Sequence, residues 1–146
     1  MSEVASPPLT GYEIYDPEDP FENHVGPFWC AQLVDGSHNF VVRADERHCN
    51  SHGIVHGGFL MTMIDLTLVM VAKTEADDRL VTVSLNSEFV ASARIGDLIE
   101  ARGELTRRGR SLAFVRGCVS CGDRVLLTAS AVLKPMGSME RIEAGQ

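Results

Sequence analysis

One acidic residue of this chain stands where apolar residues would be expected. Asp65 lies in the segment 59–72, whose other residues are almost all apolar. A helix over this segment would be apolar on nearly every side and would therefore be buried. Because an unpaired buried carboxylate costs on the order of several kcal/mol, the protein must either pair Asp65 or use it as a base of tuned pKa. A purely structural aspartate, bonded to a nearby backbone group or hydroxyl, is the alternative.

A second group with chemical potential precedes this segment, in the triplet His56-Gly57-Gly58. We expect the helix to run from about Gly57 to Lys73, with both glycines in its first turn. Amides of a first turn lack partners within the helix and lie at the positive end of its dipole. The Gly57 amide is therefore a natural donor to negative charge, and glycine allows a ligand to approach closely.

Strand patterns surround this helix. Apolar, strand-like runs occupy 28–34, 39–43, 80–90, 98–106, 111–120 and 124–133, and short turns join the last three. We therefore predict an α+β fold in which a curved antiparallel sheet wraps one central helix. The domain is expected to span 28–136, between an extended proline-rich arm (1–27), with at most a short turn near 19–21, and a flexible tail (137–146).

Composition and charge exclude some classes of function. The chain has 146 residues, which is one domain, and a formal charge of -7 from 13 basic and 20 acidic residues. No basic surplus exists to neutralise phosphates, so nucleic acid is excluded as the main partner. The four cysteines occur without a signal peptide at the N-terminus, which predicts reduced thiols and a cytoplasmic location. The segment 59–72 is too short to span a membrane.

The order Asn50, His56-Gly57-Gly58 and Asp65, followed by a long helix and a strand meander, resembles the hotdog-fold acyl-CoA thioesterases of the phenylacetate-pathway type. The resemblance covers roughly residues 28–134. It implies hydrolysis of an acyl- or aryl-CoA, with coenzyme A as part of the substrate and no separate cofactor. The turn 93–97 also resembles the family's, although Ser92 replaces its usual proline.

This chemistry assigns roles to the residues. Thioester hydrolysis needs an activated water or a carboxylate nucleophile, which Asp65 would supply, and a donor to the carbonyl oxygen, which the Gly57 amide would supply. Asn50 would orient the water or the thioester, and Thr82 would bond the Asp65 carboxylate. His56 is expected to act structurally, its ring N–H bonding a loop carbonyl so that the Gly57 amide is fixed.

Substrate contacts are expected from three further places. Gly58 leaves room beside the reacting group, and Met61 belongs to a methionine-rich helix that would give an adaptable pocket, although such methionines are often ordinary core. Three arginines of the hairpin tip would meet the phosphates of coenzyme A, although a basic tip is more often simply solvated: Arg107, Arg108 and Arg110.

The distance between the two reactive groups predicts an assembly. Eight residues of helix separate Gly57 from Asp65, which is a rise of about 12 Å and too far for both to serve one carbonyl. Two antiparallel helices at a dimer interface would bring Gly57 of one chain to Asp65 of the other. We therefore expect a homodimer joined edge to edge through its sheets, paired into a homotetramer.

Three rival functions remain open. His48, Cys49, His52 and His56 could form a metal site, although the surrounding glycines break any helix that would align them. A protein of the same fold could also bind an acyl-CoA without hydrolysing it, or hydrate an enoyl-CoA.

Overall fold

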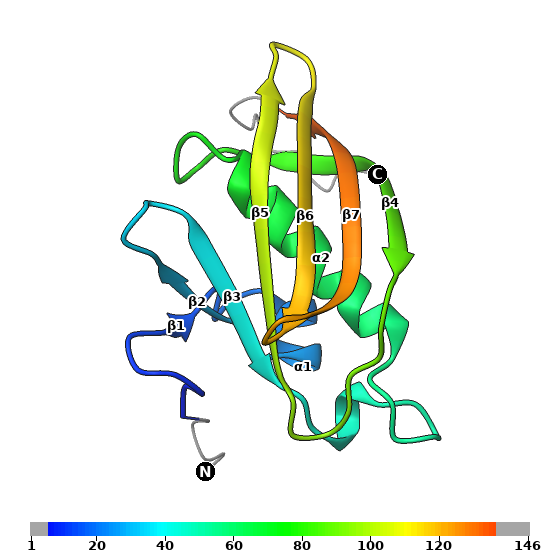
Figure 1. The fold of residues 1–146 in the computed structure, drawn as a ribbon. Helices are drawn as coiled ribbons and strands as arrows, with labels where there is room; N and C mark the ends of the chain where they lie inside the picture. Colours follow the sequence, from blue (N-terminus) through cyan, green and yellow to red (C-terminus); the bar gives the residue numbers. More distant parts are fainter. Residues whose placement is uncertain (1–5, 137–146) are drawn as a thin grey trace, which may run out of the picture.

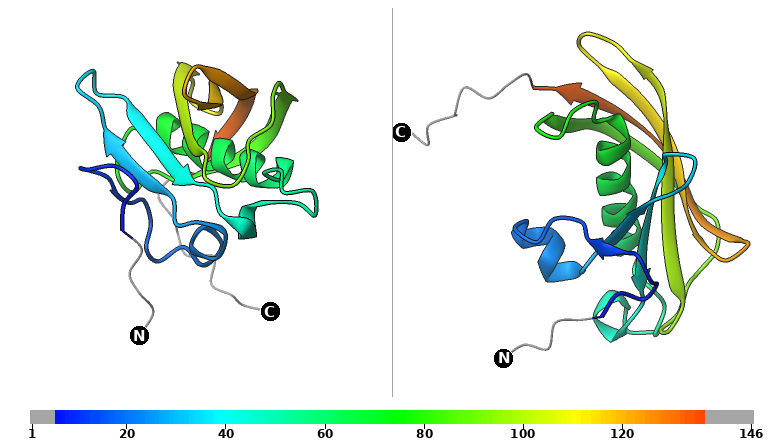
Figure 2. Two further views of the ribbon diagram at one scale, coloured as in Figure 1. Left: turned by 60° about the horizontal axis from the view of Figure 1, so that its bottom comes forward. Right: turned by 90° about the vertical axis from the view of Figure 1, so that its left-hand side faces the viewer.

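The computed structural model describes residues 6–136, which form one antiparallel sheet around one long helix, α2 (Gly57–Ala72). The sheet has seven strands in the order β1-β2-β3-β5-β6-β7-β4. The sheet is curved, and α2 lies on its concave side, as the right-hand view of Figure 2 shows. The strands are β1 (Glu13–Ile14), β2 (Trp29–Gln32), β3 (His38–Arg43), β4 (Leu80–Phe89), β5 (Leu98–Arg108), β6 (Ala113–Cys121) and β7 (Arg124–Pro135) (Figure 1). The predicted α+β architecture is confirmed.

Close packing between α2 and the sheet depends on two glycines. Gly103 of β5 pairs with Gly117 of β6 at the point where the sheet passes over Leu68. A Cβ atom at these two positions would lie 2.9 and 3.0 Å from Leu68 Cδ2. Side chains here would therefore push the helix away from the sheet and open the core.

The helix is buried on one side rather than all round, which corrects the expectation from its apolar composition. Core positions such as Met63, Ile64 and Leu68 are fully buried against the sheet. The side that carries Gly58, Thr62 and Asp65 is partly or fully exposed. One curved sheet covers only part of a helix, so Asp65 lies at the border between the covered and the open side.

The N-terminal arm is more ordered than the predicted extended chain. It contains β1, which pairs with β2, and a helix α1 (Pro20–Val25). Asp19 caps this helix by accepting a hydrogen bond from the Glu22 N–H at 2.8 Å, and proline occupies the first helical position, where its missing N–H is harmless. The predicted tail, 137–146, lies outside the described residues.

The strand β4 forms a free edge of the sheet within this chain, since β7 pairs with it on one side only. Three apolar residues of β4 and the valine that follows it are exposed: Val81, Val83, Phe89 and Val90. An exposed apolar edge strand is a surface on which another strand can add. Among residues 6–136, no helix has the length and apolar character needed to cross a bilayer.

Candidate functional site

The carboxylate of Asp65 is held by a side chain from β4. Thr82 Oγ1 donates a hydrogen bond of 2.6 Å to Asp65 Oδ1, as the sequence predicts. A bulge makes this contact: Thr82 pairs with Leu133 and Ser84 with Val132, so Val83 is an extra residue. Because directly paired residues share a side of the sheet and Leu133 is buried in the core, Thr82 points toward α2.

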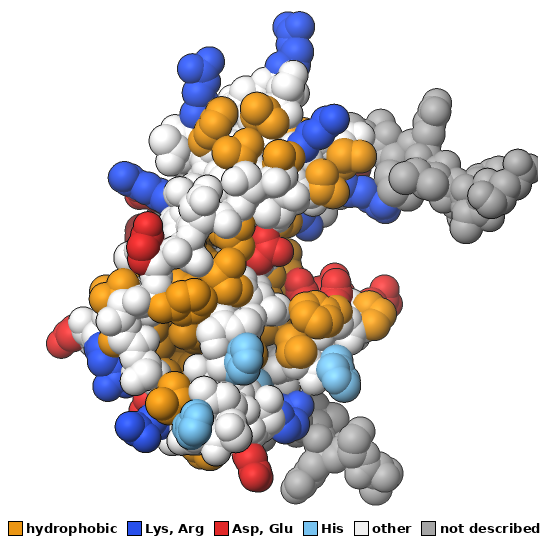
Figure 3. All heavy atoms as spheres, turned by 90° about the vertical axis from the view of Figure 1, so that its right-hand side faces the viewer, with side chains coloured by type: hydrophobic (Ala, Val, Ile, Leu, Met, Phe, Trp, Pro, Cys, Tyr) orange, Lys and Arg blue, Asp and Glu red, His pale blue; other side chains and the backbone are white. Residues whose placement is uncertain are grey.

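The rest of β4 follows the same face of the helix toward its beginning. Ser87 Oγ lies 2.9 Å from Met61 Sδ, one turn before Asp65. The ring of Phe89 covers Gly57, where a Cβ atom would lie 3.0 Å from Phe89 Cε1. Gly57, Met61 and Asp65 therefore form one row along α2 that β4 borders. Figure 3 shows this side of the molecule, with a band of hydrophobic side chains across its middle and histidines below it.

The beginning of α2 is arranged around His56. Its Nδ1 accepts a hydrogen bond of 2.8 Å from the Gly58 N–H, so the imidazole caps the helix. This corrects the expected arrangement, because the ring accepts from Gly58 rather than donating to a loop carbonyl beside Gly57. Among the described residues, no acceptor is recorded for the Gly57 amide, which belongs to a turn whose amides have no partner within the helix.

Asn50 organises the loop before α2. Its Oδ1 accepts hydrogen bonds from the His52 N–H at 2.9 Å and the Ile54 N–H at 3.2 Å. An isolated bridge between Cys49 and Val55 closes the loop. Asn50 is exposed, and its side-chain carbonyl is used by the turn, so only its NH₂ group is left to meet a ligand.

His48 does not offer a ring nitrogen to a metal. Its Nδ1 accepts from the Asp45 N–H at 2.9 Å and its Nε2 lies 2.9 Å from the Val25 carbonyl, which fixes the proton on Nε2. Burial also lowers the pKa of His48, which favours the neutral ring. In the part of the chain that the structure describes, no three His, Cys, Asp or Glu side chains are placed to hold a metal ion. Hydrolysis without a metal stays a prediction.

Of the three hairpin arginines, Arg108 is engaged within the protein. Its Nη1 donates to the Ala72 carbonyl at 2.5 Å and to Asp78 Oδ2 at 2.9 Å, at the far end of α2 from Gly57. Arg107 and Arg110 are exposed at the tip. Of the three arginines, these two are placed to contact a phosphate, and their role stays a prediction.

Sequence reasoning missed Glu22 of α1. One of its carboxylate oxygens, Oε2, is buried and has no hydrogen-bond partner among the described residues. Burial, followed by the charges of Asp19 and Asp16, raises the pKa of Glu22 to about 7, and Asp65 adds to the effect. An acidic residue in a proline-rich arm gives no signal of burial, which arises only when α1 packs beside α2.

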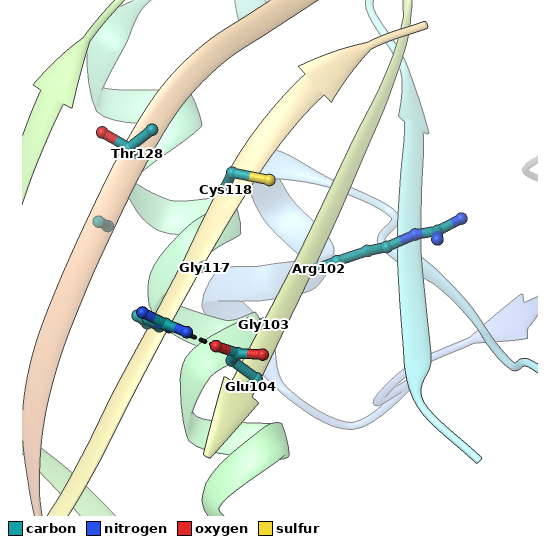
Figure 4. Close-up of a pocket in the computed structure, with 8 residues that line it drawn as sticks. Arg102, Gly103, Glu104, Gly117, Cys118 and Thr128 are labelled. Carbon is teal, nitrogen blue, oxygen red and sulfur yellow. Dashed lines mark hydrogen bonds and ion pairs between the residues drawn. The ribbon is translucent and has the colours of Figure 1, made fainter. Parts of the chain in front are cut away.

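A hollow of about 440 Å³ lies on the side of the sheet that faces away from α2. Figure 4 shows Cys118 and Thr128 on neighbouring strands, with Glu104 in an ion pair to Arg116. Side chains next to Gly103 and Gly117 on these strands point away from α2, because strand residues alternate between faces. This hollow is therefore separate from Asp65.

Comparisons with known proteins agree on one family. A model of the thioesterase superfamily matches residues 52–128, more than half of the chain. A Pseudomonas aeruginosa protein named as an esterase is 35% identical, over 84% of this chain and 92% of that protein. Human acyl-coenzyme A thioesterase 13 is 26% identical, over 64% and 68%.

A solved structure supports the same assignment. The phenylacetic acid degradation-related protein of Ralstonia eutropha, described as a thioesterase, superposes with a TM-score of 0.70 at 28% identity, over 82% of this chain and 92% of that one. The resemblance inferred from the sequence is thereby confirmed. The chain belongs to the thioesterase superfamily, as a thioester hydrolase with the hotdog fold.

Proposed function

We propose that this enzyme hydrolyses acyl- or aryl-CoA thioesters to the free acid and coenzyme A. The observation on which this rests most is the 2.6 Å hydrogen bond from Thr82 to Asp65, on the same helix face as the glycine-rich helix start. Membership of the superfamily and the name of the human relative support coenzyme A as the thiol.

The catalytic groups divide the reaction between them. The thioester oxygen accepts a hydrogen bond from the Gly57 amide, where negative charge collects as the carbonyl carbon becomes tetrahedral. Asp65 takes a proton from the attacking water, or attacks the carbonyl itself and forms a mixed anhydride that water then hydrolyses to the free acid. Thr82 occupies Oδ1 and leaves Oδ2 for the reaction. The C–S bond then breaks, and the thiolate of coenzyme A leaves and takes up a proton.

Both groups serve one carbonyl only if two chains share the site. Gly57 and Asp65 are about 12 Å apart along α2, whereas reacting atoms must lie about 3–3.5 Å from their catalytic groups. Pairing of β4 with the β4 of a second copy would set two α2 helices side by side in opposite directions. The free, apolar edge of β4 supports this homodimer. Its pairing into a homotetramer and the cytoplasmic location stay predictions.

Other contacts complete the proposed site. Asn50 would orient the water or thioester through its NH₂ group, and His56 and Gly58 would shape the helix start. Met61 would contact the substrate where α2 meets β4 at Ser87. Arg107 and Arg110 would meet the phosphates of coenzyme A.

A thiol-release screen over short, long, branched and aromatic acyl-CoA esters tests the function. We expect turnover that survives a chelator. Loss of activity in EDTA with recovery in zinc would favour the metal alternative. Tight binding of the esters without release of thiol across the whole screen would favour a non-hydrolytic binding protein.

Mixed dimers test the shared site. Asp65→Asn inactivates one half of each site, and Gly57→Pro removes the donor amide from the other half. A heterodimer of the two variants would regain one intact site, built from Asp65 of one chain and Gly57 of its partner. Verified heterodimers of two folded variants with no recovered activity would show that the catalytic groups come from one subunit.

A further inference from the structure

A cleft of about 660 Å³ lies between α1 and the beginning of α2. Phe21, His24 and Val25 line it from α1, and Gly58, Phe59 and Thr62 line it from α2. It therefore adjoins Gly57, whose amide is the proposed donor to the carbonyl oxygen. Since His56 and Gly58 on either side of Gly57 line the cleft, a group attached to that carbonyl would lie beside it.

The floor of the cleft is apolar and fixed. Phe59 is only 7% exposed, and its ring stacks on that of Phe28, with centroids 5.7 Å apart and planes at 13°. The His48 ring lies 4.2 Å from Phe59 on the same floor. Because His48 is buried and bonded at both ring nitrogens, this surface cannot easily rearrange.

The opposite wall is an aromatic side chain with no role in the core. Phe21 is 60% exposed although the cleft beside it has room for a ligand. Its helix is tied to the loop before α2: the Val25 carbonyl meets His48 Nε2 at 2.9 Å, and Arg47 Nη2 donates to the Gly26 carbonyl at 2.9 Å. Phe21 is thus an apolar surface held in place by its own helix.

Charge distinguishes between the two parts of the substrate. Arg47 reaches the cleft, but its guanidinium is already bonded to the Gly26 carbonyl and to Asp45 at 2.9 Å. Arg47 is the only Lys or Arg among the described residues that line the cleft, so a phosphate would find, besides this bonded guanidinium, only the rings of His24 and His56, whereas an apolar group would find Phe21, Val25 and Phe59. The chemistry of the lining therefore fits the acyl side of a thioester rather than the nucleotide side.

We propose that α1 forms one wall of the acyl-binding cleft and that Phe21 determines which acyl groups the enzyme accepts. This inference rests on the proposed thioesterase function and adds to it a specificity-determining residue from the N-terminal arm. Burial of the acyl group against Phe21 would favour long or bulky groups over acetyl, since acetyl is too short to reach the wall.

The test compares kcat/KM across a series from acetyl-CoA to long-chain and aromatic acyl-CoA esters. We expect Phe21→Ala to lower kcat/KM for the large esters by about fivefold to tenfold while changing acetyl-CoA by less than about twofold, the scale of lost apolar contact in a pocket. Phe21→Trp narrows the cleft and should shift the preference toward smaller groups. Val34→Ala removes an exposed apolar side chain in the turn before β3 and serves as the control.

The outcomes separate this inference from the proposed function. If the wild-type protein hydrolyses the esters but both Phe21 variants change kcat/KM equally for all of them, the role of Phe21 is overturned and the proposed function is not. If the wild-type protein releases no thiol from any ester, calorimetric titration with non-hydrolysable thioether analogues of two lengths still tests the wall. Binding of the long analogue that Phe21→Ala does not weaken would then overturn it.

Discussion

The two ends of α2 differ in how completely their backbone groups are used. At its end, Arg108 bonds the Ala72 carbonyl and Asp78, while Asp78 also accepts from the Thr74 N–H at 3.1 Å. At its beginning stand two glycines, of which only Gly58 has a cap, supplied by His56. The end is therefore closed by protein groups, whereas the beginning keeps an amide available beside a cleft.

We infer that the end of α2 contributes mainly to stability and its beginning mainly to catalysis. Unpaired groups at a helix terminus cost free energy unless water or a ligand meets them. Where the protein closes the terminus itself, we expect substitutions to change the free energy of unfolding. Where it does not, we expect them to change turnover. Three substitutions test this contrast, in order of decreasing effect.

The largest effect is expected at Asp65, on the reactive side. Asp65→Asn keeps the shape of the side chain and removes its basicity, so kcat should fall by about a hundredfold or more, with little change in the free energy of unfolding. Steady-state thiol release and chemical denaturation measure the two quantities. Thr82→Val, which removes only the hydroxyl bonded to Asp65, should reduce kcat less. Wild-type rates in Asp65→Asn on every ester would remove this carboxylate from the mechanism.

The next effect is expected at the closed end. Arg108→Ala leaves the Ala72 carbonyl without this donor and leaves Asp78 with its hydrogen bonds from Thr74 alone. We expect a loss of about 2 kcal/mol in the free energy of unfolding, the scale of hydrogen bonds to a charged group. Arg110→Ala, at the exposed tip of the same hairpin, should change it by less than about 0.5 kcal/mol. Equal stability of the two variants would contradict the closing role of Arg108.

The pH dependence of this loss has a definite sign. Hydrogen bonds from Arg108 and then from Thr74 lower the pKa of Asp78 to about 2. A carboxyl whose pKa is lowered on folding stabilises the protein above its ordinary pKa, and this contribution disappears as the pH falls from about 4 through about 2. The difference in stability between wild type and Arg108→Ala should therefore shrink over that interval.

The bounds of α2 and the main contact of Asp65 could be predicted from the sequence, because they depend on local patterns. The helix was predicted over 57–73 and observed over Gly57–Ala72, and the Thr82–Asp65 contact was predicted as well. The bulge at Val83 was not, because alternation along β4 would have put Thr82 on the opposite face from Leu85. Register changes of this kind depend on pairing with β7, which the segment itself does not encode.

The N-terminal arm marks where sequence reasoning failed. A six-residue helix in a proline-rich segment has no clear periodicity, and it is held by the Asp19 cap and by the contacts of Val25 and Gly26 with His48 and Arg47. The raised pKa of Glu22 also depends on this packing. Asp19 followed by Pro20 is a helix-start signal where we predicted only a turn, whereas no pattern within residues 1–27 indicates the burial of Glu22.

The smallest effect is expected at Glu22 of α1, whose pKa is affected by Asp65 of α2 and by Lys73 at the end of that helix. Folding raises its pKa from the ordinary 4.5 to about 7, mainly through burial and then through Asp19 and Asp16, with Lys73 acting in the opposite direction. The folded state thus holds this proton more tightly than the unfolded chain, so stability falls as the pH rises from about 4.5 through about 7.

Glu22→Gln removes the charge and keeps the shape. The variant should equal wild type near pH 4 and exceed it by about 1 kcal/mol at pH 8, a value reduced from the full linkage because solvent screens a half-buried group. Denaturation curves at both pH values measure this difference, with Glu18→Gln, an exposed carboxyl of the same arm, as the control. A constant difference between pH 4 and pH 8 would mean that the buried oxygen of Glu22 finds a donor in solution. In that case the buried carboxylate of Glu22 would be hydrogen-bonded, as Arg108 and Asp78 are at the end of α2. The difference between paired and unpaired polar groups would then be confined to the two glycines at the beginning of α2.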